Sequence, residues 1–373
     1  MSASLRDRYD LVIVGGGPAG ATAAVRAARD GAGVLVIEKN TCPRPRRCTG
    51  WLGPAGVAMC EEIGLPAHDA GAQPFASVHL HSWDLQRSAH VEDPELRGWL
   101  IERGPFDDAV LKRATDAGAD ALAGVEVIDL RLGEEEAVLE LSDGRRATGR
   151  IMLIADGAHS PIGRRANLVP AIGVPHLPHC AFVEYPAGGT RRDSRSAGLE
   201  IAVGASRSGQ VVTVMRAGAH VRVSLMMRGE PSEVGEAFTR FAAAAIERGL
   251  LPDGMPAPRL RISPAGAALD LETHVGKRCL LIGDAGGFVA AFSNEGIFPA
   301  MRSGWLAAET ALRALAAPVP QDELATFGPQ WRRELADYLR MPNTDLSLLV
   351  PLVFNNAQMS RRVVRSFLLG QPF

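Results

Sequence analysis

The segment LVIVGGGPAG at residues 11–20 constrains the fold of this chain more than any other stretch. An apolar run leads directly into Gly15, Gly17 and Gly20, which have the spacing G-x-G-x-x-G, and an alanine-rich stretch follows. In a strand–turn–helix unit the first glycine permits a tight turn, the second lets a diphosphate approach the backbone, and the third lets the helix lie close to the strand. These residues predict a dinucleotide-binding site near the start of the chain.

Residues on both sides of the turn support this prediction. Pro18 and Ala19 open the expected helix, whose free N–H groups and positive potential attract a diphosphate. Glu38 ends the next apolar segment, VLVIE, eighteen residues after Gly20, and Lys39 follows it. A carboxylate at that distance can accept hydrogen bonds from both ribose hydroxyls. An ordinary βα turn is the alternative interpretation, because glycine turns are common in proteins.

The composition is that of a soluble globular protein. The 373 residues suffice for two or three structural units, and 46% are hydrophobic and 22% charged. A net charge of −2 creates no field for nucleic acid, so we expect no nucleic-acid partner. The five cysteines lack metal-ligand spacing, and no apolar run approaches the roughly 20 residues that span a bilayer. This pattern predicts reduced thiols and a cytoplasmic location.

The predicted fold class is α/β, with a Rossmann-like cofactor domain assembled from separate parts of the chain. Apolar strands, glycine turns and amphipathic helices recur in these parts, and residues 125–156 have the alternating pattern of a β-meander with a turn at Asp143-Gly144. The segments that we assign to the cofactor domain are residues 1–73, 101–170 and 266–319.

The remaining segments predict a second domain and a helical tail. Residues 74–100 and 171–265 contain alternating strand-like runs, which predict an antiparallel-sheet substrate domain with one helix capped by Ser232. Residues 320–373 predict a helical C-terminal segment. Its apolar half and arginines could lie on a membrane or on a protein partner, or the segment could pack on the cofactor domain.

Two further glycine motifs lie at predicted strand ends. Asp156-Gly157 ends the strand in IMLIADG, and Gly283-Asp284 ends the strand in CLLIGDA, with EGI following at residues 295–297. The trio of GxGxxG, DG-x-x-S and GDA…EGI resembles the flavoproteins of the p-hydroxybenzoate hydroxylase-like superfamily. Within it, EGIFPAMRSGWLAAE and the early cysteine loop look most like the geranylgeranyl reductase family. The resemblance implies an FAD-dependent oxidoreductase.

The GDA…EGI segment favours FAD over NAD alone. Asp284 at a strand end can hydrogen-bond a ribityl chain, which NAD lacks. We expect a helix to begin near Glu295-Gly296, with its N-terminus directed at the flavin. The N–H groups of Gly296 and Ile297 would then stabilise the negative charge of the reduced pyrimidine ring.

Two arginines are candidates for the FAD phosphates. Arg103 matches the family's arginine after the third strand, which contacts the diphosphate or ribityl region; an ion pair with Glu102 or Asp107 is the alternative. Arg47 lies in the loop that follows the second strand. It could reach the diphosphate or belong to a solvated basic loop.

Cys48 is the candidate catalytic residue. Cys48-Thr49-Gly50 resembles the Cys-Gly-Gly element that the family places near the flavin, with threonine replacing the first glycine. A thiol there could donate a proton to a substrate carbon while hydride arrives on its neighbour; a packed small residue is the alternative. Ala290-Ala291 replaces the family's Asn-Pro, and Asn294 stands where glycine is usual, which predicts a reshaped flavin edge.

The favoured function is an FAD-dependent reductase, reduced by NADH or NADPH, that acts on a hydrophobic or small organic substrate. The alternative is a flavin monooxygenase that uses O₂ and a flavin hydroperoxide; a halogenase or a partner-modifying maturation flavoprotein is less favoured. The chain has no second GxGxxG, so a nicotinamide would bind without a Rossmann domain of its own. Arg164 and Arg165 are candidates for its phosphates, or they form a solvated helix end.

Overall fold

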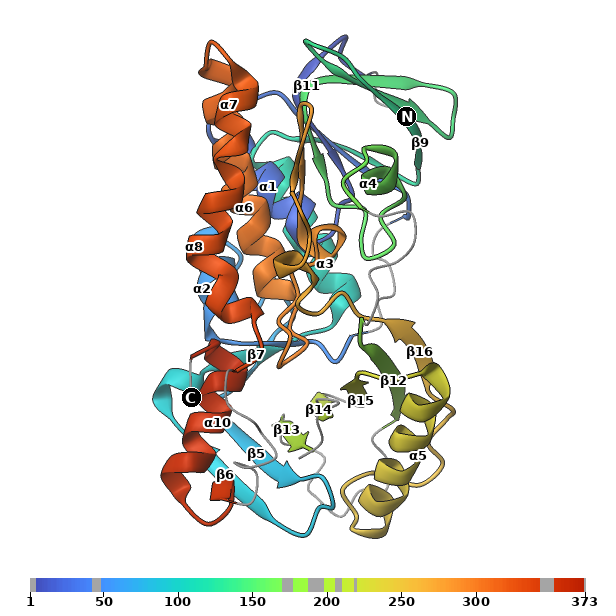
Figure 1. Ribbon diagram of the computed structural model, residues 1–373, viewed down its shortest axis with the longest axis vertical. Helices are drawn as coiled ribbons and strands as arrows, with labels where there is room; N and C mark the ends of the chain where they lie inside the picture. Colours follow the sequence, from blue (N-terminus) through green and yellow to red (C-terminus); the bar gives the residue numbers. More distant parts are fainter. Residues whose placement is uncertain are drawn as a thin grey trace.

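The computed structural model describes most of the chain, including most of each of the three segments of the expected cofactor domain. The described residues are 5–41, 48–169, 177–186, 198–204, 210–217, 220–342 and 352–371. Figure 1 shows the arrangement: helices and a parallel sheet occupy one end of the molecule, and an antiparallel sheet with its own helix occupies the other.

The first sheet is built around strand β1 (Tyr9–Val14), as the apolar run predicts. β1 pairs in parallel with β2 (Val34–Glu38) on one side and β11 (Arg146–Ile154) on the other. The sheet has eight strands, and its main path has the order β17-β18-β11-β1-β2-β8. The outer strands of this path are β8 (Asp120–Ala123), β18 (Cys279–Leu281) and β17 (Val275–Gly276).

The predicted β-meander extends this sheet. Strands β9 (Val127–Leu132) and β10 (Ala137–Leu141) pair with each other and then with β11, in antiparallel orientation. Gly144 has φ +83° in the turn between β10 and β11, a left-handed conformation that glycine tolerates. The meander is thus joined to the parallel strands through β11, whereas β8, which pairs with β2 at the sheet edge, was not singled out in the sequence.

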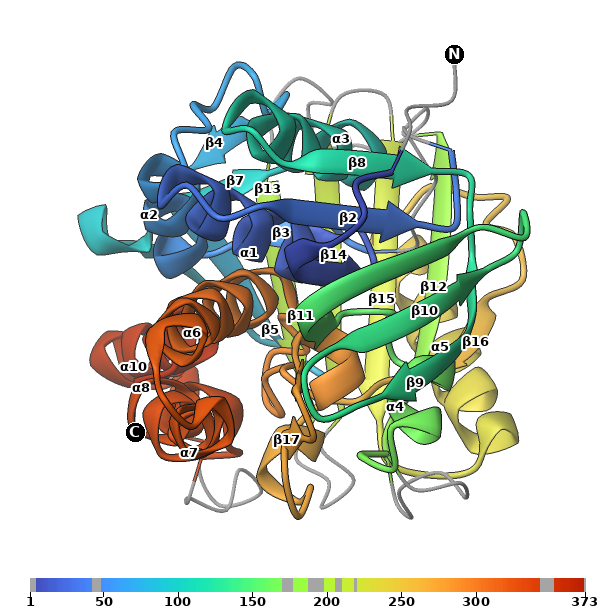
Figure 2. The ribbon, with the colours of Figure 1, turned by 90° about the horizontal axis from the view of Figure 1, so that it is seen from above.

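Three helices cover one face of the parallel strands and bury a continuous apolar core. They are α1 (Pro18–Arg29), α3 (Arg103–Asp116) and α6 (Ile297–Ala316). A Cβ on Gly20 would lie 2.0 Å from the carbonyl oxygen of Gly15 and 3.0 Å from the side chain of Ile13. Only glycine therefore allows α1 to approach β1 this closely. Figure 2 shows α6 on one side of β11, with β9 and β10 on the other.

The second sheet has seven strands in the order β16-β12-β15-β14-β13-β5-β6. Neighbours pair in antiparallel orientation, except β13 with β5. The strands are β5 (Ser77–Ser82), β6 (Ser88–Glu92), β12 (His179–Pro186), β13 (Gly198–Val203), β14 (Val211–Ala217), β15 (His220–Met227) and β16 (Arg259–Ile262). Both predicted segments of the substrate domain thus contribute strands to one sheet.

Helix α5 (Pro231–Glu247) packs on this sheet, and its cap differs from the prediction. Pro231 occupies the first helical position, so Glu230 is the N-cap and Ser232 lies inside the first turn. The Glu233 carboxylate accepts the backbone N–H of Glu230 at 2.9 Å, which completes a capping box. Proline was the stronger signal because its missing N–H suits the first turn.

A small three-stranded sheet joins the two larger ones. Its order is β3-β7-β4, with β3 (Trp51–Leu52), β4 (Gln73–Phe75) and β7 (Gly98–Leu100). The ends of the 74–100 segment therefore pair outside the seven-stranded sheet, and the domain bounds stay a prediction. The remaining short elements are α2 (Pro54–Glu62), α4 (Pro161–Arg165), η1 (Pro94–Leu96), η2 (Ala267–Leu269) and η3 (Gly283–Gly286).

The C-terminal segment is helical but packs in two places. Helices α7 (Pro320–Ala325) and α8 (Phe327–Leu339) lie along α6. Helix α10 (Ala357–Leu369) instead buries its apolar face against the antiparallel-sheet side, where the rings of Phe367 and Trp51 stack at 5.3 Å. Among the described helices, none has the length and apolar character needed to cross a membrane. The α/β fold class with its meander, antiparallel sheet and helical tail is confirmed.

Candidate active site

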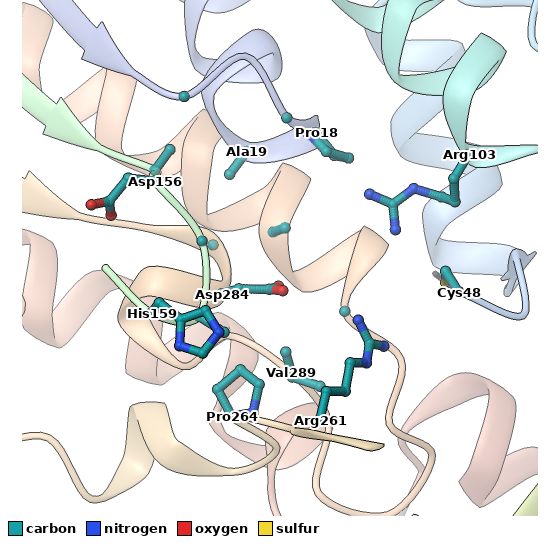
Figure 3. A pocket seen from close by; sticks show the side chains of 18 of the residues that line it. Pro18, Ala19, Cys48, Arg103, Asp156, His159, Arg261, Pro264, Asp284 and Val289 are labelled. Atoms are coloured by element: carbon teal, nitrogen blue, oxygen red, sulfur yellow. The ribbon is translucent and has the colours of Figure 1, made fainter. Parts of the chain in front are cut away.

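A cavity of about 1010 Å³ lies between the parallel strands and the antiparallel sheet. Nearly all the predicted site residues line it, although they come from distant parts of the chain (Figure 3). The predicted residues on its wall are Gly15, Gly17, Pro18, Ala19, Glu38, Lys39, Cys48, Arg103, Asp156, Gly157, Gly283, Asp284, Gly296 and Ile297. Gly20 and Glu295 do not line the cavity, and Arg47 lies outside the described residues.

The start of α1 supplies uncapped N–H donors at one wall of the cavity. Gly15 has φ +107°, and a Cβ there would lie 2.2 Å from the carbonyl oxygen of Ala155. Glycine is therefore required for the turn. Gly17 is the N-cap of α1 and Pro18 follows, so no side chain caps the first N–H groups of this helix. Uncapped N–H groups at a helix N-terminus suit a diphosphate.

Glu38 is held rigidly at the end of β2. Its side chain is 2% exposed, and Oε2 accepts the backbone N–H of Gly16 at 2.9 Å. Oε1 accepts the backbone N–H of Asn40 at 2.9 Å and its side-chain amide at 2.7 Å. Glu38 also lines the cavity, so this fixed carboxylate lies at its wall. The geometry suits a fixed acceptor for ribose hydroxyls.

Two aspartates at the ends of neighbouring strands differ in their surroundings. Asp156 accepts hydrogen bonds from the hydroxyl of Ser160 at 2.6 Å and from the N–H of Ile162 at 2.8 Å, and burial raises its pKa. Asp156 thus shapes the turn into α4. Asp284 is exposed to the cavity, and the preceding Gly283 donates its N–H to Ser303 at 3.0 Å. Asp284 is the better placed of the two to bind a ligand hydroxyl.

The side chain of Glu295 accepts hydrogen bonds from the first turn of α6 and from Tyr338 instead of facing the cavity. Oε1 accepts the N–H of Phe298 at 2.8 Å, and Oε2 accepts the hydroxyl of Tyr338 at 2.8 Å. Burial raises the pKa of Glu295 to about 7. The following residues, Gly296 and Ile297, do line the cavity, so α6 begins at its wall as expected.

Arg103 and Cys48 lie together on one side of the cavity (Figure 3). Nε of Arg103 donates to Oδ1 of Asp107 at 2.8 Å, and Nη2 donates to Oδ2 at 3.2 Å, so the ion pair that was the alternative interpretation exists, while the FAD-binding role stays a prediction. Burial alone would lower the pKa of Arg103, but Asp107 and the neighbouring Cys48 raise it. Cys48 is half-buried, with one side against the core. Cys48 therefore lies at the cavity wall.

The wall formed by the antiparallel sheet contains residues that the sequence did not single out. Arg261 on β16 points into the cavity near Asp284 and Cys48 (Figure 3). Asn294 has φ +55°; its Oδ1 accepts the hydroxyl of Ser263 at 2.6 Å, and its amide donates to Cys180 Sγ at 3.7 Å. Asn294, which stands where the family usually has glycine, thus links the segment before α6 to the antiparallel sheet. This contact depends on how the two sheets pack together, so the sequence alone could not reveal it.

These residues fit FAD. The uncapped N-terminus of α1, the fixed carboxylate of Glu38, the exposed Asp284 and the N-terminus of α6 line one cavity. Together they offer partners for a diphosphate, a ribose, a ribityl chain and an electron-accepting ring, which are the parts of FAD. The cavity volume is of the size that a large cofactor with a small substrate requires.

Comparison with known proteins agrees with this assignment. The family described as "FAD dependent oxidoreductase" matches residues 10–43. Digeranylgeranylglycerophospholipid reductase 1 of Methanopyrus kandleri is 27% identical over 341 residues, which cover 88% of this chain and 87% of that protein. Menaquinone reductase of Mycobacterium tuberculosis is 34% identical over 173 residues, 43% of this chain and 41% of that protein.

The fold is shared with a solved structure. A geranylgeranyl bacteriochlorophyll reductase-like protein from Thermoplasma acidophilum superposes with a TM-score of 0.78 at 20% identity, and the match covers 96% of this chain and 95% of that one. The motifs on the cavity wall, the sequence relatives and this shared fold lead to one assignment. The chain is an FAD-dependent oxidoreductase, and over most of its length it is similar in sequence to digeranylgeranylglycerophospholipid reductases.

Proposed function

We propose that the chain is a reductase that takes electrons from NADH or NADPH and passes them to a C=C bond of a hydrophobic or small organic substrate. FAD supplies the hydride chemistry when it is bound. The observation that carries the proposal is the position of Cys48, whose thiol lies on the cavity wall close to Arg103 and Arg261. The two sequence relatives described above are named as reductases, which supports this choice.

Residues in different parts of the cavity would bind different parts of the cofactor and the substrate. The N-terminus of α1 and Glu38 would hold the adenosine half of the cofactor, and Asp284 would bind its ribityl chain. The N-terminus of α6 would stabilise negative charge at the far end. Cys48 would hold a proton at Sγ and deliver it to the substrate carbon next to the one that receives hydride.

We place the nicotinamide in the same cavity. Arg164 donates to the carbonyl of His159, and Arg165 forms an ion pair with Asp129 at 3.4 Å, so both predicted phosphate ligands already have partners. His159 itself lines the cavity, and it offers the edge at which a second nucleotide could enter. The four described cysteines are free thiols, which supports a reducing compartment such as the cytoplasm.

Helix α10 offers a surface for a membrane or protein contact, which was one of the two interpretations that the sequence left open. Its apolar face is buried within the protein, and Arg361 and Arg362 face outward. We therefore propose a membrane or protein contact only for the outward face that carries Arg361 and Arg362, because the apolar face of the helix is already buried.

Anaerobic reduction of the purified protein tests the reductase proposal. The protein should be yellow, and one of the two nicotinamides should bleach the flavin. Admission of O₂ should then re-oxidise it quickly, with release of one hydrogen peroxide per flavin. Slow re-oxidation, with transfer of an oxygen atom from ¹⁸O₂ to an added organic substrate, would favour the monooxygenase. A colourless protein that takes up no added FAD would overturn both.

A further inference from the structure

Two arginines of the edge strand β16 line the cavity. Arg259 and Arg261 are two residues apart, so they lie on the same face of the strand, and both line the cavity. Their cross-strand neighbours on β12 are Phe182 and Cys180. This wall therefore combines two guanidinium groups with an aromatic side chain.

Arg261 has thiol neighbours in place of a carboxylate partner. It interacts with Cys180, and Cys48 and Asp284 are close enough for their charges to raise its pKa, although burial alone would lower it. Within the part of the chain that the structure describes, no ion pair within 4.0 Å joins Arg259 or Arg261 to a carboxylate. Arg103 on the opposite side, by contrast, is paired with Asp107 at 2.8 Å.

The two arginines face the cofactor residues from across the cavity. In Figure 3, Pro18 and Ala19 lie on one wall, and Arg261 rises from the other toward the space between Asp284 and Cys48. On the proposed function, FAD occupies the wall that carries the glycine motifs. The guanidinium of Arg261 then faces the space left for substrate, close to the thiol that would protonate it.

We propose that Arg261, assisted by Arg259, is a recognition site for an anionic group on the substrate, a carboxylate or a phosphate; this inference rests on the proposed function. A guanidinium fork binds such groups through paired, charge-assisted hydrogen bonds. The apolar part of the substrate would lie against Phe182, the cross-strand neighbour of Arg259 on the same wall. The site therefore selects acidic organic molecules over neutral ones of the same shape.

Binding of matched probes to the FAD-loaded protein tests this site. Octanoate, octyl phosphate and octanamide share one alkyl chain, and each is titrated while the flavin absorbance is recorded. The wild-type protein should bind at least one anion roughly 10- to 100-fold more tightly than the amide, because hydrogen bonds to charged groups are strong. The two anions separate a carboxylate site from a phosphate site.

Three variants complete the test. Arg261→Gln should reduce the preference for the anion to near unity while FAD affinity stays at the wild-type value. Arg261→Lys keeps the charge without the fork and should retain part of the preference. Arg240→Gln removes an exposed charge on α5 and should change nothing.

Each contrary outcome has a separate meaning. An unchanged anion preference in Arg261→Gln, or no preference in the wild-type protein, overturns the recognition site. Loss of FAD from both Arg261 variants also overturns it, because the arginine would then serve the cofactor. Failure of the wild-type protein to bind FAD at all refutes the proposed function itself, before any probe is added.

Discussion

The hydroxyl of Tyr338 donates a 2.8 Å hydrogen bond to Oε2 of Glu295, and this contact ties the end of α8 to the start of α6. Glu295 is 2% exposed, and burial raises its pKa from 4.5 to about 7, against the opposing effects of its hydrogen bonds and of Arg103. Cys60 also lies within its electrostatic reach. The carboxyl therefore changes charge near neutral pH, next to the wall of the cavity.

This pair predicts a pH-dependent stability. Because the folded-state pKa exceeds the unfolded value of 4.5, the native protein binds the extra proton between about pH 4.5 and 7. The free energy of unfolding should thus fall as pH rises through this window, by about 2–3 kcal/mol. Urea denaturation at several pH values measures the slope. In Glu295→Gln the fall should disappear, and an unchanged slope in that variant would contradict the assignment.

The close contact between α1 and α6 predicts that one methyl group added at Gly304 lowers both the stability of the protein and its affinity for FAD. A Cβ on Gly304 would lie 2.1 Å from the carbonyl oxygen of Ala19, so Gly304→Ala must push the two helices apart. We expect a loss of about 1–3 kcal/mol in stability and weaker FAD binding, since the N-terminus of α1 would move. Thermal denaturation and FAD titration measure the two effects.

Gly235→Ala on α5 is the matched control for that experiment. A Cβ at Gly235 has no atom within 4 Å, so this change should be neutral or stabilising by about 0.5–1 kcal/mol. Equal stability losses in the two variants would show that the close approach of α1 and α6 is not the cause.

Replacement of Glu38 is expected to weaken FAD binding without unfolding the protein. In Glu38→Ala the ribose hydroxyls would lose their acceptor, at about 1 kcal/mol for each hydrogen bond, and FAD should bind roughly 10-fold more weakly. Titration of the apoprotein with FAD gives the dissociation constant. Glu38→Gln retains one acceptor oxygen and should lose less. Wild-type affinity in Glu38→Ala would remove the residue from the site.

Replacement of Cys48 is expected to slow substrate turnover without changing the flavin spectrum or its reduction. In Cys48→Ser and Cys48→Ala the flavin spectrum and the rate of reduction by nicotinamide should be unchanged, since neither needs the thiol. Conversion of substrate should fall about 10²-fold or more if the thiol is the general acid. Should Cys48→Ala turn over substrate at the wild-type rate, the residue is a packing residue, as its contact with the core allows.

The sequence alone was sufficient to predict the local turns and strand ends on the cofactor side of the cavity, although not strand β8. The turn at Gly15, the close approach at Gly20, the strand ending at Glu38 and the turn at Asp143-Gly144 all depend on residues near one another in the chain. Glycine spacing, apolar runs and hairpin turns express local backbone preferences. They can therefore be recognised without knowledge of the rest of the fold.

Only the tertiary structure decided which side chains meet across the cavity. Asn294 contacts Cys180 from 114 residues away, and Arg261 reaches the surroundings of Asp284 because β16 pairs with β12 at the edge of the second sheet. The carboxyl of Glu295 turned out to face Tyr338 and not the cavity. Such contacts depend on how two sheets and the tail helices pack together, and no local pattern in the chain encodes that packing.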